Sequence, residues 1–314
     1  MAGKRGDRST HDTHDLGAVL AARHDSLRTH LVAARRGTED GVHRARVATR
    51  RLREIVPVVA SGLHGVRRRR LQRGLRALTR ALGDVRECDV TLGLLGSVDG
   101  TASPELAGVV RKGRQALRAR RRDARAALGE VGEDVDVRKV DTRLQRLLLA
   151  RRNTTDRTWR TLLARQLDTR ARRLRTRLEH AGVVYATEPL HEVRIAGKKL
   201  RYALELVKET GLAPVARLVR QLSQVQDVLG HLHDLDVLVA QLRATVVGEL
   251  EASNGSSAVE QLDSSLEGER RTLHATYLRR RAALMRLADV VRDEIVTPVR
   301  GDSAGDPGDG GDGL

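Results

Sequence analysis

Histidine, arginine and lysine recur in this sequence at a spacing that places them on one side of a helix. At about 100° per residue, four side chains of an early segment share an arc of about 80°: His43, Arg46, Arg50 and Arg53. Four side chains of a later segment share the same arc: His191, Arg194, Lys198 and Arg201. We call these the first and second stripes. Clustered cations bind phosphate through charge-assisted hydrogen bonds, so each stripe is predicted to bind an anion.

A solvated charged face is the alternative interpretation of such a run. Like charges three or four positions apart repel by about 0.2–0.5 kcal/mol per pair, so the arrangement gives a helix no stability. A solvated face normally mixes both signs, whereas neither stripe contains an acidic residue. We therefore favour phosphate binding.

The two stripes belong to an internal repeat. His43 and His191 are 148 positions apart (191 minus 43). A second block follows each stripe, in which Leu82-Gly83 returns as Leu229-Gly230, 147 positions later (229 minus 82). Two blocks in the same order at nearly the same offset predict an internal duplication.

Composition and periodicity predict an all-α fold. The sequence is rich in Arg, Ala, Leu and Val, has six Pro and no Phe, and shows amphipathic helical periodicity nearly throughout. We expect one helix to end at Leu82 and another at Leu229, each followed by a new helix, and a single helix over 138–181. The expected units are a disordered N-terminus over 1–11, a first repeat over 12–130, a second repeat over 138–298 and a disordered acidic Gly/Asp tail over 299–314.

The histidine that opens each stripe has several chemical interpretations. His43 and His191 could act as cations, as hydrogen-bond donors to phosphate, as metal ligands or as phosphoacceptors. Neighbouring arginines are expected to lower the pKa of both rings, which would leave them mostly neutral donors near pH 7.

A further row of arginines follows the first stripe. The row comprises Arg69, Arg73, Arg76 and Arg80, opposite an apolar face of leucines. The corresponding residues after the second stripe are Ala216, Arg220, Ser223 and Asp227. An anion-binding surface should therefore be lopsided toward the first repeat.

The second block offers a weak metal-binding pattern. Its candidate ligands are His231, His233, Asp234 and Asp236, of types that bind zinc or manganese. The aligned residues of the first repeat, Asp84, Arg86, Glu87 and Asp89, make a poor site. Capping of the expected new helix explains the acids, so we predict no metal and no other cofactor.

The totals favour a polyanionic partner. The chain has 314 residues and a formal net charge of +17 at pH 7, which attracts nucleic acid, anionic membrane or polyphosphate. Cys88 is the single cysteine, so no disulfide can form within the chain. No apolar run approaches the roughly 18 residues of a membrane span, and no secretory signal is evident. We expect a cytoplasmic protein that does not bind membranes.

With these residues in view, the chain resembles the CHAD domain family, the conserved histidine α-helical domain. The resemblance covers roughly residues 12–298. Its motifs are His-x-x-Arg-Val-Ala-x-Arg-Arg-Leu-Arg from His43, Leu-His-x-x-Arg-Ile-x-x-Lys-Lys-Leu-Arg-Tyr from Leu190 and Leu-Gly-x-x-x-Asp-x-Asp-Val from Leu229. The first repeat departs from the third motif at Gly83–Asp89, which leaves the role of that turn open.

The resemblance implies two helical bundles related by a pseudo-twofold axis, with a basic groove or pore between them. It also implies binding of inorganic polyphosphate and, often, association with polyphosphate granules. By position, the family's histidines are His43 and His191, and the remaining residues of both stripes face phosphate. The outer contacts that it implies are Arg51, Lys199, Arg73, Arg76 and Arg80.

Two other functions stay open as alternatives. Sequence-independent nucleic-acid binding suits the charge, but single-strand binders stack bases on aromatic rings, and Trp159, Tyr185, Tyr202 and Tyr277 are widely spaced. A metal-dependent polyphosphate-processing enzyme would need a carboxylate cluster or a poised nucleophile. The stripes contain no acid, and no Gly-rich phosphate loop is present, so we expect a non-catalytic protein. Its oligomeric state stays open.

Overall fold

The computed structural model describes residues 15–60, 65–98, 103–133, 136–151, 158–246 and 252–301. Within these ranges the chain forms helices joined by turns, with no strand, so the all-α prediction is confirmed. The helices are α1 (Leu16–Arg35), α2 (Glu39–Val59), α3 (Gly65–Val98), α4 (Pro104–Glu133), α5 (Asp136–Arg151), α6 (Thr158–Ala181), α7 (Thr187–Glu209), α8 (Ala216–Val246), α9 (Ala252–Val290), a π-helical turn η3 (Val291–Ile295) and α10 (Val296–Arg300).

Local sequence signals explain how α2, the helix of the first stripe, begins. Thr38 is its N-cap, and its hydroxyl accepts a hydrogen bond from the Gly41 amide at 3.2 Å. Gly37 has a φ of +81°, the left-handed conformation that turns the chain from α1 into α2. At Gly41, a Cβ would lie 2.6 Å from backbone atoms of Ala33 and Ala34. Only glycine lets α2 approach α1 this closely.

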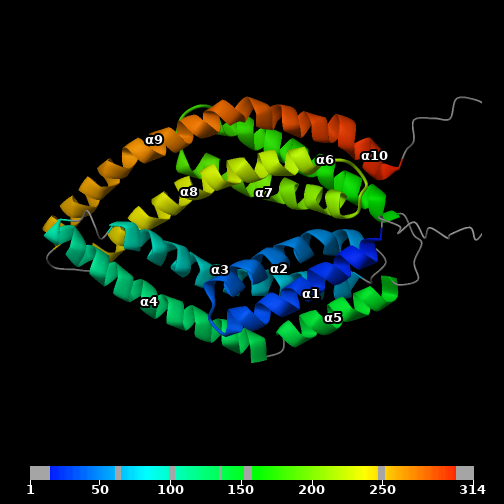
Figure 1. Ribbon diagram of the computed structural model, residues 1–314, viewed down its shortest axis with the longest axis horizontal. Helices are drawn as coiled ribbons and strands as arrows, with labels where there is room; N and C mark the ends of the chain where they lie inside the picture. Colours follow the sequence, from blue (N-terminus) through cyan, green and yellow to red (C-terminus); the bar gives the residue numbers. More distant parts are fainter. Residues whose placement is uncertain are drawn as a thin grey trace, which may run out of the picture.

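The helices pack in two groups that are stacked in Figure 1. In the lower group α1 packs on α2, α2 on α3 and α3 on α4; in the upper group α6 packs on α7, α7 on α8 and α8 on α9. We call α1–α5 the first half and α6–α10 the second half. The expected boundary between 130 and 138 does not match this packing, because α5 packs against α1, α3 and α4. Helix α5 therefore belongs to the first half.

Three expected helix boundaries were wrong. Helices α3 and α8 run without interruption through Gly83 and Gly230. A helical glycine costs about 1 kcal/mol relative to alanine, but Leu82 and Val85, on either side of Gly83, are both fully buried, and this packing holds the helix together. Conversely, the single helix expected over 138–181 is two helices, α5 and α6.

The expected tails coincide largely with residues outside the described ranges. The segment 1–11 lies wholly outside them, as do residues 302–314. Residues 299 and 300, expected in the tail, are instead helical: Val299 is fully buried and α10 continues to Arg300.

No helix in the described ranges is both long enough and apolar enough to cross a bilayer.

Two hydrophobic cores join the halves. The larger contains buried residues of both, among them Leu52 and Ile55 of α2 and Leu200 and Leu204 of α7. The smaller joins the far ends of α3 and α4 to α8 and α9, where the two halves converge in Figure 1. Between these two attachments, α2 and α3 face α7 and α8 across the site described next.

Candidate anion-binding site

A central cavity of about 970 Å³ lies between α2, α3, α7 and α8. All eight stripe residues line it: His43, Arg46, Arg50, Arg53, His191, Arg194, Lys198 and Arg201. The two stripes, 148 positions apart in the sequence, therefore meet on one site.

Of the outer contacts implied by the family resemblance, one lines the cavity and the others do not. Lys199 lines the cavity. Arg51 is not among the lining residues; its Nε donates to Glu205 Oε2 at 2.9 Å instead. The arginines at 73, 76 and 80 are exposed on α3 and do not line the cavity.

Arg201 lines the cavity but is held by neighbours. Its Nη1 donates to Glu205 Oε1 at 2.7 Å, and its Nε donates to Gln226 Oε1 at 2.8 Å. Its guanidinium also lies 4.8 Å from the centroid of the Tyr202 ring. Glu205 thus bridges Arg201 of α7 and Arg51 of α2, which ties the two helices together beside the cavity.

Arg46 and Arg194 occupy matching positions above a glycine. An ideal Cβ on Gly83 would lie 3.6 Å from Arg46 Nε, and one on Gly230 would lie 4.0 Å from Arg194 Nε. Both Nε atoms are buried and have no hydrogen-bond partner among the described residues. A buried donor without a partner costs about 1–3 kcal/mol, more when it is charged. The repeated glycines therefore lie directly beneath two cationic donors available to a ligand.

The cations of the two stripes lie close enough to lower one another's pKa. Burial and the charges of Arg194, Arg50 and Arg46 lower the pKa of Lys198 to about 6. Burial, with Arg50 and Arg194 next in size, lowers the pKa of Arg46 to about 10. Each group is thus disfavoured as a cation by charges from the opposite half, and a bound polyanion would relieve that cost.

The stripe histidines have depressed pKa values, as predicted. Burial is the main cause for His43 and His191, and the neighbouring arginines add to it. His233, one of the candidate metal ligands, lies with its ring centroid 4.7 Å from that of His191. Burial, followed by the charge of Arg194, lowers the pKa of His233 to about 4. Near pH 7 the three rings are neutral donors or acceptors.

Sequence reasoning missed the role of the repeated aspartate at the end of each second block. Asp89 is buried and lies 2.6 Å from Arg121 Nε of α4. Its counterpart Asp236 lies 3.3 Å from Arg270 Nε of α9 and accepts a hydrogen bond from Tyr185. These acids are within helices, so the capping interpretation was wrong. Each one joins the third long helix of its half to the fourth.

The metal-ligand candidates of the second half do not converge on one point. His231 Nε2 lies 2.9 Å from Glu269, while Asp236 is engaged by Tyr185 and Arg270. Across the described ranges, no group of three or more His, Cys, Asp or Glu is arranged to hold a metal ion.

One buried and one partly buried arginine, both outside the predicted site, hold the stripe helices in place. Arg23 Nη1 of α1 donates to the Arg51 carbonyl at 2.8 Å, and Arg170 Nη1 of α6 donates to the Lys199 carbonyl at 2.9 Å. Arg51 and Lys199 are counterparts in the repeat (199 minus 51 is 148). The same bond therefore fixes α2 and α7 in each half.

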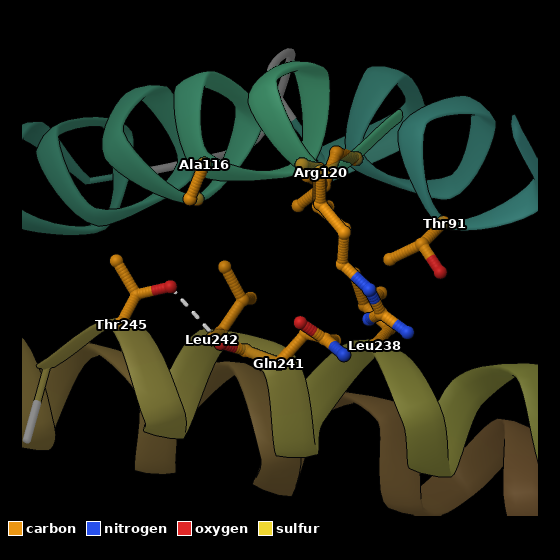
Figure 2. Close-up of a pocket in the computed structure, with 10 residues that line it drawn as sticks. Thr91, Ala116, Arg120, Leu238, Gln241, Leu242 and Thr245 are labelled. Carbon is orange, nitrogen blue, oxygen red and sulfur yellow. Dashed lines mark hydrogen bonds between the residues drawn. The ribbon is translucent and has the colours of Figure 1, made fainter. Parts of the chain in front are cut away.

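A smaller pocket of about 80 Å³ lies between α3, α4 and α8 (Figure 2). Leucine, alanine and threonine side chains dominate its lining, with Arg120 reaching in from α4. The Thr245 hydroxyl donates to the Gln241 carbonyl at 3.0 Å, a bond within α8. The pocket contains none of the stripe residues, and it belongs to the smaller core.

Comparison with known proteins agrees with the fold and the motifs. The CHAD domain family model matches residues 18–243. A crystal structure of the CHAD domain from the plant Ricinus communis is similar with a TM-score of 0.57 and 20% identity, covering 93% of this chain and 92% of that one. PptA from Streptomyces chartreusis is similar with a TM-score of 0.58 and 16% identity, covering 90% of this chain and 97% of that one.

No curated protein matches the sequence. At these identities the solved structures speak for the fold alone, whereas the family match extends over most of the chain. The chain belongs to the CHAD domain family.

Proposed function

We propose that this protein binds inorganic polyphosphate in the central cavity. The observation that carries the proposal is the convergence of both stripes on one cavity, where cations lower each other's pKa. A cluster of this kind lowers the stability of the free protein and is compensated by a bound ligand with many negative charges.

The cavity chemistry supports a linear phosphate polymer in particular. Arginine presents a fork of donors to phosphate oxygens, and the neutral histidines can add single hydrogen bonds. These groups face the cavity from both halves, so a chain inside it would be bound from two sides. The association with polyphosphate granules that the family resemblance implies is part of the same proposal.

Sequence-independent nucleic-acid binding has less support from the cavity. Tyr202 is the single Tyr or Trp among the lining residues, and the Arg201 guanidinium lies over its ring. A single-stranded nucleic acid would find no row of aromatic faces on which to stack its bases.

The proposal is one of binding without chemical change. The cavity-lining Glu54 forms an ion pair with Arg170, and Glu87 forms one with Arg120. Across the described ranges, no group of three acidic or histidine side chains is arranged to hold a metal ion. Incubation of polyphosphate with the protein in Mg²⁺ or Mn²⁺ should release no phosphate. Turnover would contradict this part of the proposal.

The test is an affinity series with long-chain polyphosphate over a range of salt concentrations. If about six phosphates are contacted and counterions are released as from single-stranded nucleic acid, the log–log slope should be about −4. Single-stranded DNA of equal charge is the competitor. Two variants, Arg46→Gln/Arg50→Gln and Arg194→Gln/Lys198→Gln, remove charge from one stripe each.

Polyphosphate should bind more tightly than DNA, and its affinity should be lower for both variants than for the wild type. Equal affinity for the two polymers, or binding that neither variant changes, would contradict the proposal.

A further inference from the structure

The arginines of α3 that do not line the cavity nevertheless share a helical face with residues that do. At about 100° per residue, the exposed arginines at 69, 73, 76 and 80 fall in one arc of about 60° with the lining residues Glu87, Thr91 and Leu94. The cavity wall formed by α3 therefore continues toward the N-terminus of that helix as a row of arginines. We call these four residues the α3 track.

The α3 track joins the cavity at Arg53. Arg53 lines the cavity, and Arg76 is near enough to contribute to lowering its pKa. From Arg69 to Arg80 the track spans 11 residues (80 minus 69), or about 17 Å of helix. Positive charge therefore continues from Arg53 in the cavity to Arg76 and the other exposed arginines of the track.

The track carries charge that the fold does not use. Its side chains are exposed and form no ion pair with any described residue. Residues 65–83 of α3 contain seven arginines and no acid. Repulsion along such a face gives no stability to the helix, so the charge is available to an external anion.

The second half has no equivalent track. By the 147-residue offset, Arg220 is the one arginine among the counterparts of the track. The counterparts of Arg76 and Arg80, which are the two nearest the cavity, are Ser223 and Asp227, and both of these line it. The counterpart of Arg53 is Arg201, which is bound to Glu205 and Gln226. A polyanion leaving the cavity along α8 would therefore meet a hydroxyl and a carboxylate, whereas one leaving along α3 would meet cations.

We propose that a polyphosphate chain longer than the cavity continues along the α3 track, so that the protein distinguishes long from short chains through the first half alone. This inference rests on the proposed function, because the cavity is taken to hold the inner part of the same chain. The outer part is bound by exposed arginines, so its contribution depends on chain length and is sensitive to salt.

The experiment compares tripolyphosphate with long-chain polyphosphate on two matched triple variants. Arg73→Gln/Arg76→Gln/Arg80→Gln neutralises the track. Arg111→Gln/Arg118→Gln/Arg122→Gln removes the same charge from an exposed face of α4 whose residues do not line the cavity. Circular dichroism checks that both variants keep their helix content.

The track variant should bind tripolyphosphate as the wild type does and long chains about tenfold more weakly. Its salt slope for long chains should be shallower by about 2, from three lost contacts at about 0.7 each. The α4 variant should change the affinity for long chains and its salt slope much less.

Equal weakening of long-chain binding by the two triple variants would overturn the inference in favour of a general charge effect. So would unchanged long-chain binding in the track variant. If the cavity variants still weaken polyphosphate in either case, the proposed function stands. If the two double variants of the stripes bound both tripolyphosphate and long chains as tightly as the wild type does, the proposed function itself would be refuted.

Discussion

Lys198 shows at the scale of one residue how the site sets binding against stability. It lies in the second stripe with Arg194, Arg50 and Arg46 close enough to depress its pKa, and burial contributes most. With a pKa of about 6, the free side chain is mostly neutral at pH 7. A bound phosphate chain would favour its charged form.

Binding of polyphosphate at pH 7 should therefore be accompanied by uptake of up to about one proton at this residue. The pKa rises on binding, so affinity should increase as pH falls toward 6 and gain little from Lys198 below it. Calorimetry in buffers of different ionisation enthalpy measures the uptake. The control is Lys198→Arg, which puts at position 198 the residue found at Arg50 in the first stripe.

Lys198→Arg should bind polyphosphate with clearly reduced proton uptake. Uptake equal to that of the wild type would show that other groups, such as His43 or His191, titrate instead.

The same depressed pKa predicts that the free protein becomes less stable as pH falls, whereas its affinity for polyphosphate increases. The unfolded chain holds a proton on Lys198 up to its ordinary value of 10.5, while the folded protein loses it near 6. The wild type is thus destabilised progressively as pH falls from 10.5 to 6. Lys198→Met should raise the free energy of unfolding of the free protein by about 1–2 kcal/mol at pH 7.

Urea unfolding at pH 7 and pH 9 measures this gain, which should be smaller at pH 9. Lys198→Met should also weaken polyphosphate binding. A variant less stable than the wild type at pH 7, or a gain independent of pH, would contradict the depressed pKa.

At the scale of the element, buried ion pairs set the positions of the long helices. Asp89 has a fully buried side chain and pairs with Arg121, so α3 is fixed against α4. Removing one partner of a buried pair leaves an uncompensated charge. Asp89→Asn should lower the free energy of unfolding by about 2–3 kcal/mol, less than a full loss because Arg121 also reaches Glu39.

Chemical denaturation compares Asp89→Asn with Asp40→Asn, which removes the exposed pair with Arg44 and should cost about 0.3–0.5 kcal/mol. Tripolyphosphate affinity of the folded Asp89→Asn protein should be unchanged, since Asp89 does not line the cavity. Equal costs for the two variants would mean that Asp89 is not the structural anchor described.

The cationic stripes could be predicted from the sequence because they are local and periodic. The four residues of the first stripe share one helical face whatever surrounds the helix, and their repetition in the second stripe indicates a function. The Asp89–Arg121 pair could not be predicted, because its partners are 32 positions apart (121 minus 89) and no local pattern marks them. The helix end expected at Leu82 was wrong for a related reason: burial of Leu82 and Val85 keeps α3 continuous through Gly83, and that burial depends on the tertiary structure.

At the scale of the whole molecule, the arrangement of the halves turns two stripes into one site. The cores at both ends of the cavity hold α2 and α3 opposite α7 and α8. Arg50 contributes to lowering the pKa of Arg194 across the interface. The two stripes should therefore bind one ligand together and not one ligand each.

A double-mutant cycle distinguishes one shared site from two separate ones. Tripolyphosphate affinity and stoichiometry are measured for the wild type, Arg50→Gln, Arg194→Gln and the combined variant. We expect one ligand per chain and a coupling of at least about 0.5 kcal/mol between the two substitutions. Two ligands per chain with additive losses would show that each stripe binds by itself, and would contradict a single shared site.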